Sequence, residues 1–227
     1  MRLRAALILA ILIRATGYSA TAGSLDDVLV RMDRAAPAFK GFSAGLRSVT
    51  HTAVIDEDET EKGRILLKRG KRDMTMLVEF TEPNPKSVAV HDRKAEIYYP
   101  KLQTIEEYDI GQYQTLLDQF MLIGFGTSGK ELATAYDMKV LGSENVAGTQ
   151  ATHLELIPKS AEVRKSLKKL ELWIPESEGY PVQQKIYLAA GDYKLFTYTN
   201  VKMNPPLSDS DLKLKVPKDT KHVSPQR

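Results

Sequence analysis

The segments EKGRILLKR (Glu61–Arg69) and MTMLVEFT (Met74–Thr81) lie on either side of a short turn that begins at Gly70. Each segment is rich in branched or bulky apolar residues, and a second turn at Pro83 closes the pair. Short apolar runs that are bounded by glycine and proline are typical of β-strands. We therefore expect two neighbouring strands here, joined by a tight turn.

Turn residues and short apolar runs alternate in the same way through most of the chain, with no internal repeat and no dividing linker. An antiparallel sheet of this size must curl or close on itself. The sequence therefore predicts a mainly β (α+β) protein of about eleven strands. The other strands are expected at Phe42–Val54, Ser87–His91, Lys94–Tyr99, Thr104–Tyr108, Asp137–Ser143, Thr149–Pro158, Leu167–Pro175, Val182–Ala189 and Tyr193–Lys202. Leu212–Val216 is a candidate for a final short strand.

Three segments favour helix over strand. Ser24–Ala36 has apolar residues at helical spacing and begins with a residue that can cap its first turn. Tyr113–Ile123 carries a stripe of bulky apolar side chains, and a short helix is expected to start at Ser128, with Glu131 in capping-box position. Such amphipathic helices fit across the open side of a curled sheet. Between two later strands, Ser160–Arg164 is expected to form a polar excursion.

The chain of 227 residues has a formal charge of +3, but the excess is confined to its N-terminus. Met1–Ala22 holds three of the 32 basic residues and no acid, so the remainder has 29 of each sign. Its basic start, its apolar run Ala5–Ile13 and its small residues before Gly23 have the layout of a secretory signal peptide. An uncleaved N-terminal anchor is the alternative. We expect residues 1–22 to direct export to the periplasm and residues 23–227 to form one domain.

Several classes of chemistry lack their sequence signals. The chain has no cysteine, and its four histidines are isolated rather than paired at helical spacing. It has no G-x-S-x-G nucleophile elbow. The balanced charge after residue 22 gives no electrostatic drive toward nucleic acid. We therefore expect a monomer that is not an enzyme and that binds no cofactor, metal or nucleic acid.

One motif suggests a nucleotide-binding site but lacks the features of a phosphate-binding loop. Gly124–Lys130 matches G-x-x-x-x-G-K, but Glu131 stands where a phosphate loop needs Ser or Thr. The motif also follows an expected helix, whereas a phosphate loop follows a strand. We interpret it as a glycine turn between two helices.

Several segments, in this order, resemble the LolA-type periplasmic carriers of outer-membrane lipoproteins, members of a LolA/LolB-like superfamily. The resemblance spans nearly the whole chain after the N-terminal segment. It implies an incomplete, strongly curved antiparallel β-barrel with a helical lid over an apolar cavity. The segments are the G-x-hydrophobic-K-R strand Gly63–Arg69, the strand end Phe80–Pro83, the turn Asp92–Lys94, the aromatic-proline piece Tyr98–Pro100, the helix Tyr113–Ile123 with Gly124–Gly126, and the closing segment Leu214–Pro217.

The resemblance implies a carrier that shields lipoprotein acyl chains between the inner and outer membranes. Its partners would be an inner-membrane lipoprotein-releasing ABC transporter and an outer-membrane lipoprotein acceptor. A periplasmic lipid-binding or lipoprotein-sensing module of the same fold is the alternative. The lipid-anchored acceptor itself is disfavoured because the chain has no cysteine. A secreted hydrolase is disfavoured because a nucleophile signal is lacking.

The resemblance also indicates the site. Arg69 would point inward and hydrogen-bond the lid, closing the ligand-free form, although the family has proline where Gly70 stands. The strand period of two then places Leu67 and Ile65 on the face of Arg69. An ordinary core under a fixed helix, with Arg69 on the surface, is the alternative interpretation. The residues expected to line the cavity and bind lipid are Ile65, Leu67, Met76, Val78, Phe80, Tyr98, Leu117, Phe120 and Met121.

Overall fold

The computed structural model describes residues 23–70, 74–111 and 123–225. The expected signal peptide and almost all of the expected helix Tyr113–Ile123 lie outside these residues. In the part of the chain that is described, no helix is both long enough and apolar enough to cross a membrane.

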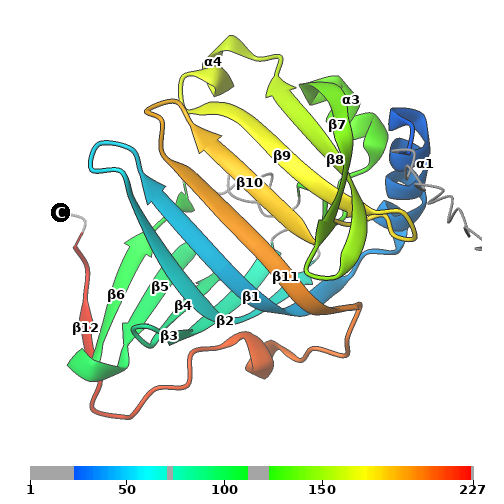
Figure 1. Cartoon of the computed structure of the whole chain (residues 1–227). Helices are drawn as coiled ribbons and strands as arrows, with labels where there is room; N and C mark the ends of the chain where they lie inside the picture. Colours follow the sequence, from blue (N-terminus) through cyan, green and yellow to red (C-terminus); the bar gives the residue numbers. More distant parts are fainter. Residues whose placement is uncertain (1–22, 71–73, 112–122, 226–227) are drawn as a thin grey trace, which may run out of the picture.

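Twelve strands of the described residues form one sheet, in the order β12-β6-β5-β4-β3-β2-β1-β11-β10-β9-β8-β7. Neighbouring strands are antiparallel, except that β12 runs parallel to β6. Figure 1 shows that the sheet curves around a concave face. The strands are β1 (Gly41–Thr52), β2 (Glu57–Arg69), β3 (Met74–Glu82), β4 (Lys86–His91), β5 (Lys94–Tyr99), β6 (Thr104–Asp109), β7 (Tyr136–Val146), β8 (Thr149–Pro158), β9 (Leu167–Pro175), β10 (Gln183–Leu188), β11 (Tyr193–Met203) and β12 (Lys221–Val223).

Helices cover one part of the concave face. Val28 and Met32 of α1 are fully buried and pack with Leu154 of β8 and Leu172 of β9. Leu132 of α3 belongs to the same cluster, so both helices sit over the β8–β9 end of the sheet. The helical segments are α1 (Leu25–Ala35), α3 (Gly129–Ala135) and α4 (Ala161–Arg164), with short 3-10 turns η1 (Ala36–Ala38), η2 (Pro100–Leu102) and η4 (Asp209–Leu212).

The C-terminal segment covers part of the opposite, convex face. Residues 204–223, here called the strap, run along the outside of the sheet from β11 to β12 (Figure 1). Leu212 is 1% exposed and packs with Leu77 of β3 and Ala89 of β4. Lys68 holds the same turn through an ion pair of 2.7 Å with Asp209. The strap thus buries apolar residues that point away from the concave face.

Most of the predicted elements are confirmed, with ends that differ by a few residues. Ser24 caps α1, and Ser128 with Glu131 forms the predicted capping box of α3. The polar excursion over residues 160–164 contains the short helix α4. The predicted strand Leu212–Val216 is wrong, because Leu212 ends a 3-10 turn and its side chain is buried on the convex face. The last strand is instead β12, at Lys221–Val223.

We predict that Leu212→Ala lowers the free energy of unfolding by about 2–5 kcal/mol, because it leaves a cavity under the strap. The matched control is Leu102→Ala, since Leu102 is 70% exposed, and this change is expected to stay within about 0.5 kcal/mol. Chemical denaturation of the three proteins measures both effects. Equal losses in the two variants would contradict the role assigned to the strap.

Candidate apolar binding cavity

A cavity of about 210 Å³ lies on the concave face. Strands β1, β2, β3, β10 and β11 contribute its walls, together with the loop Ile123–Gly126. Its lining is apolar apart from one amide and one phenol. The lining residues are Phe42, Leu46, Ile65, Leu67, Met76, Val78, Phe80, Phe125, Gln184, Ile186, Phe196 and Tyr198.

The strand register explains why these side chains converge. Phe42, Leu67 and Met76 are opposite one another on β1, β2 and β3. Residues directly opposite across antiparallel strands lie on the same face, so the row forms one continuous apolar surface. Two residues along, Ile65 and Val78 form the next row. The alternation seen in the sequence of β2 and β3 therefore builds the wall of the cavity.

Gly63 allows β2 and β3 to approach closely at the end of this wall. It lies opposite Phe80, where the register shifts by one residue. A Cβ atom at this position would overlap the carbonyl oxygen of Glu79. Any larger residue at position 63 would therefore push β3 away and displace the Phe80 ring from the cavity.

Phe125 lines the cavity from the loop side. Its ring stacks on Phe42, with centroids 4.1 Å apart, and meets Tyr198 edge-on at 5.2 Å. The side chain is 1% exposed. Offset-stacked and edge-to-face aromatic pairs contribute about 0.5–1.5 kcal/mol beyond area burial. Phe125 is therefore a plug, held by aromatic contacts against the concave face of β1 and β11.

Two side chains of the sheet hold the backbone on either side of this plug. The Arg69 guanidinium donates a hydrogen bond of 2.9 Å to the carbonyl oxygen of Gly126 and also lies over the Phe39 ring. Gln184 donates from its amide nitrogen to the carbonyl oxygen of Ile123. Arg69 therefore contacts the loop that follows residues 112–122, and the lid-locking role expected of it stays a prediction.

Gly126 meets the geometric needs of this anchor. Its backbone has a φ of +79°, in the left-handed region that favours glycine. A Cβ atom there would also overlap the Phe39 ring. The segment of the apparent phosphate-loop motif thus has a structural role, because Gly126 within it allows the loop to turn between Arg69 and Phe39.

The polar atoms inside the cavity satisfy one another. The Tyr198 hydroxyl donates a hydrogen bond of 2.6 Å to the side-chain oxygen of Gln184. Burial raises the pKa of Tyr198 well above that of an exposed phenol, so the hydroxyl remains a neutral donor. Because none of the described residues that line the cavity is charged, a ligand inside it meets dispersion contacts and little directional bonding.

The structure places the predicted cavity residues in three groups. Ile65, Leu67, Met76, Val78 and Phe80 line the cavity. Leu117, Phe120 and Met121 lie outside the described residues. Tyr98 is described but is not among the residues that line the cavity.

Tyr98 does not line the cavity. Its neighbour Ile97 is in register with Val88, which pairs with the cavity residue Val78. Because successive residues of a strand point to opposite faces, Tyr98 points to the convex face. It is buried there, opposite Ser87 and Ile105.

The sequence interpretation missed the residues that come from other parts of the chain. Phe42 and Leu46 belong to a strand whose alternation is weak, so its inner face was not assigned. Gln184 was not singled out because a lone polar residue in a strand normally points to solvent. Phe125 carries a local signal of its own, because a large apolar residue between two glycines is unusual in an exposed turn. The other residues that were missed are Ile186, Phe196 and Tyr198.

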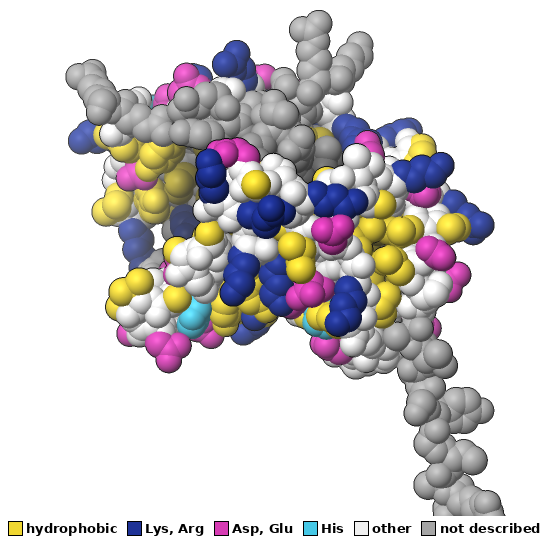
Figure 2. All heavy atoms as spheres, turned by 90° about the horizontal axis from the view of Figure 1, so that it is seen from above, with side chains coloured by type: hydrophobic (Ala, Val, Ile, Leu, Met, Phe, Trp, Pro, Cys, Tyr) yellow, Lys and Arg dark blue, Asp and Glu magenta, His cyan; other side chains and the backbone are white. Residues whose placement is uncertain are grey.

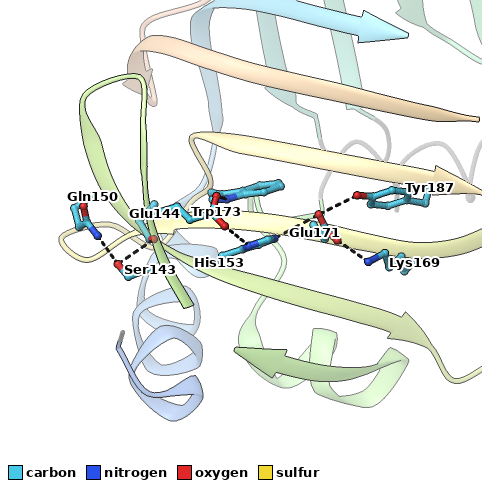
Figure 3. A network of polar contacts seen from close by, with 9 residues as sticks. Ser143, Glu144, Gln150, His153, Lys169, Glu171, Trp173 and Tyr187 are labelled. Carbon is cyan, nitrogen blue, oxygen red and sulfur yellow. Dashed lines mark hydrogen bonds and ion pairs between the residues drawn. The ribbon is translucent and has the colours of Figure 1, made fainter. Parts of the chain in front are cut away.

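A polar network on the convex face is the main competing site (Figure 3). The His153 ring stacks on Trp173 at 4.1 Å, and its Nδ1 lies 2.8 Å from Glu144. Its Nε2 lies 3.4 Å from a carboxylate oxygen of Glu171. In the next register row, Lys169 reaches the same carboxylate at 2.6 Å.

Hydrogen bonds within this network stabilise the charged forms of Glu144 and Lys169. The indole N–H of Trp173, followed by His153, lowers the pKa of Glu144. Burial alone would lower the pKa of Lys169, but its hydrogen bonds to Glu155 and Glu171 raise it above its ordinary value. The groups are ion-paired among themselves and lie on the face opposite the cavity. Within the described residues, no cluster of His, Asp and Glu has the arrangement of a metal site.

The charges on the described surface are mixed in sign. Figure 2 shows basic and acidic side chains interspersed over the face seen from above. This agrees with the balanced charge of the chain after residue 22. The apolar cavity is therefore the feature that best defines a binding site.

No protein-family model matches the sequence, and no curated protein matches it significantly. Several solved structures, in contrast, align with this chain. MucB aligns with a TM-score of 0.51 at 18% identity, covering 85% of this chain and 64% of the MucB chain, so this chain spans less than two thirds of MucB. An uncharacterized conserved protein from Thermus thermophilus aligns with a TM-score of 0.53 at 14% identity, covering 89% of this chain and 99% of that one.

A LolA superfamily protein from Nitrosomonas europaea also aligns, with a TM-score of 0.38 and 15% identity over 85% of this chain and 99% of that one. At such identities a likeness concerns the fold alone. The chain shares its fold with MucB and the Thermus thermophilus protein, and that fold is a strongly curved, open antiparallel sheet, as the sequence predicted.

We predict that Phe125→Ala destabilises the protein by about 3–5 kcal/mol, because it removes a buried ring, and that it enlarges the cavity. An apolar void of this kind stays dry and takes up small apolar molecules. Calorimetric titration with benzene should therefore detect binding to the variant and little binding to the unmodified protein. Equal benzene binding by both proteins would show that Phe125 does not plug the cavity.

Proposed function

We propose that this protein is a periplasmic carrier that shields the acyl chains of lipoproteins on their way from the inner to the outer membrane. The observation that carries the proposal is the uncharged cavity closed by a plug, Phe125, that is itself held by Arg69 and Gln184. Ile65, Leu67, Met76, Val78 and Phe80 would contact the chains.

The physical need for such a site is clear. Each methylene transferred from water to an apolar site contributes about 0.8 kcal/mol, so an acylated protein cannot leave a membrane unaided. Dispersion contacts accept chains of varied shape and also release them, whereas strong polar anchoring would hinder delivery. Met76 suits this task, because its side chain is flexible and polarizable.

The size of the cavity supports a closed, ligand-free conformation. Its volume of about 210 Å³ is below the roughly 300–1,000 Å³ that is typical of small-molecule sites. Acyl chains would enter only after Phe125 leaves its place between Phe42 and Tyr198. Residues 123–126, which from here on are called the lid, would then move away from the cavity. Arg69 would control how readily this movement occurs.

The N-terminal segment supports export, which the carrier role requires. We propose an inner-membrane lipoprotein-releasing ABC transporter as the donor and a lipoprotein acceptor at the outer membrane as the recipient. Any ATP would be used by the transporter, and the carrier itself would be monomeric, without enzymatic activity or cofactor.

The first test is ligand recovery. We predict that native mass spectrometry of the protein purified from the periplasm detects acyl-bearing ligands, and that the purified protein solubilises a triacylated lipoprotein from membrane vesicles. If no acyl ligand co-purifies and none can be loaded, the carrier proposal is wrong. If ligand loads but does not pass to acceptor membranes, a sensing or lipid-binding module of the same fold is favoured instead.

The second test concerns release. Arg69→Leu removes a charge-assisted hydrogen bond that is made only when the lid is closed, and such a bond contributes about 1.5–3 kcal/mol. We predict that the variant binds acyl ligand about tenfold more tightly and releases it correspondingly more slowly. Fluorescence competition with an acyl probe measures both quantities. Arg64→Leu is the control, because Arg64 lies on the same strand and pairs with Glu79 outside the cavity.

A further inference from the structure

A second hollow lies beside the cavity. It is a groove of about 540 Å³ between the β7–β8 turn, the connection from β9 to β10, and the end of β11. β11 extends beyond its pairing with β10, which stops at Thr197 opposite Gln183. The last residues of β11 pair with β1 on one side, and on the other side they border this groove. The lining residues are Val146, Ala147, Thr149, Pro175, Ser177, Glu178, Tyr180, Val182, Tyr198, Thr199, Asn200 and Val201.

Three aromatic rings form the wall between groove and cavity. Tyr198 lines both hollows. Tyr180 belongs to the groove and stacks on Phe125, the plug of the cavity, with centroids 6.2 Å apart. Phe125 in turn meets Tyr198 edge-on. Removing the Phe125 ring would therefore connect the cavity with the groove.

The wall is coupled to the lid by hydrogen bonds. Tyr198 donates to Gln184, and Gln184 donates to the carbonyl of Ile123 at the start of the lid. A displacement of residues 123–126 breaks the second bond and withdraws Phe125 from both tyrosines. The two hollows would then form one continuous site, apolar at the cavity end.

The groove end has different chemistry. Thr149, Ser177, Thr199 and Asn200 contribute hydroxyl and amide groups. Among the described residues that line the groove, Glu178 is the only charged one. Burial, together with the neighbouring Glu178 carboxylate, raises the pKa of Tyr180 and keeps its hydroxyl neutral. The groove therefore suits hydrogen-bonding groups without negative charge, because Glu178 repels an anion.

From this arrangement we infer that the groove binds the head group of an acyl amphiphile whose chain lies in the cavity, and that it selects uncharged heads with hydroxyl or amide groups over phosphate. The inference rests on the proposed carrier function and specifies its ligand. An acylglycerol and an acylated peptide share the required chemistry, and the test separates them.

The first experiment compares probes with one chain and different heads. Palmitoyl glycerol, a palmitoylated dipeptide amide and palmitoyl glycerol phosphate are titrated against the unmodified protein, Glu178→Lys and the matched control Glu176→Lys. Glu176 is exposed and does not line the groove. We expect the unmodified protein and the control to prefer the neutral heads about tenfold, and Glu178→Lys to lose or invert this preference, since a charge at contact distance is worth at least that factor.

The outcomes distinguish a failure of the groove assignment from a failure of the carrier proposal. If the three probes bind the unmodified protein equally and Glu178→Lys changes nothing, the groove assignment is wrong while the carrier proposal stands. If no probe binds, the carrier proposal fails and the groove assignment fails with it. The ratio between the glycerol and dipeptide arms shows which neutral head is preferred.

A second experiment locates the head directly. Because the chain has no cysteine, Ser177→Cys places a single thiol in the groove, and Glu176→Cys places one just outside it. We expect saturating palmitoyl glycerol to slow maleimide labelling of position 177 at least about fivefold and to leave position 176 unchanged. Equal labelling of position 177 with and without bound probe would overturn the assignment, whatever the charge variants show.

Discussion

The packing of the Phe125 ring on Phe42 of β1 and Tyr198 of β11 is the contact on which the cavity side of the concave face depends. A strongly curved sheet turns many apolar side chains toward a space that the strands cannot fill themselves. Helices α1 and α3 fill it over β8 and β9. Over β1 to β3 the described residues supply mainly one ring and the short loop that carries it. The shape of the cavity therefore follows the position of residues 123–126.

The strength of this closure determines what could open it. Burying one phenylalanine contributes about 1.5–3 kcal/mol. The hydrogen bond of Gln184 adds about 1 kcal/mol, and that of the charged Arg69 adds about 1.5–3 kcal/mol. The sum is roughly 4–7 kcal/mol, which about five to nine buried methylenes would offset. For the proposed carrier, the burial of one acyl chain of ordinary length would therefore offset the loss of the plug contacts, and the plug would return when the chain leaves.

The sequence predicted the parts of the fold that depend on local pattern. The apolar alternation and punctuation of β2 and β3 located the wall of the cavity, and the capping residues Ser24 and Ser128 located two helices. The error at Leu212–Val216 arose because alternating residues can also form a strap that packs on a sheet without pairing with it.

The remaining site residues depend on contacts that are distant in sequence. Gln184 and Tyr198 reach the loop that carries Phe125 only because β11 and then β10 follow β1 in the sheet, and no local pattern encodes this. Tyr98 shows the converse limit. It was assigned to the cavity by its place in an aromatic-proline motif, whereas the register of β4 and β5 turns it to the convex face.

Much of the sheet is held by contacts that lie away from the cavity, both under helices α1 and α3 and on the convex face. On the convex face the strap buries Leu77 and Ala89, while Lys169 forms ion pairs with Glu155 and Glu171. Breaking such contacts leaves uncompensated groups and is costly, so this face holds the curvature of the sheet. The concave face can then contain a small cavity and a removable ring without unfolding the protein. The proposed exchange of acyl chains needs a frame whose stability does not depend on the contents of the cavity, and these contacts provide one.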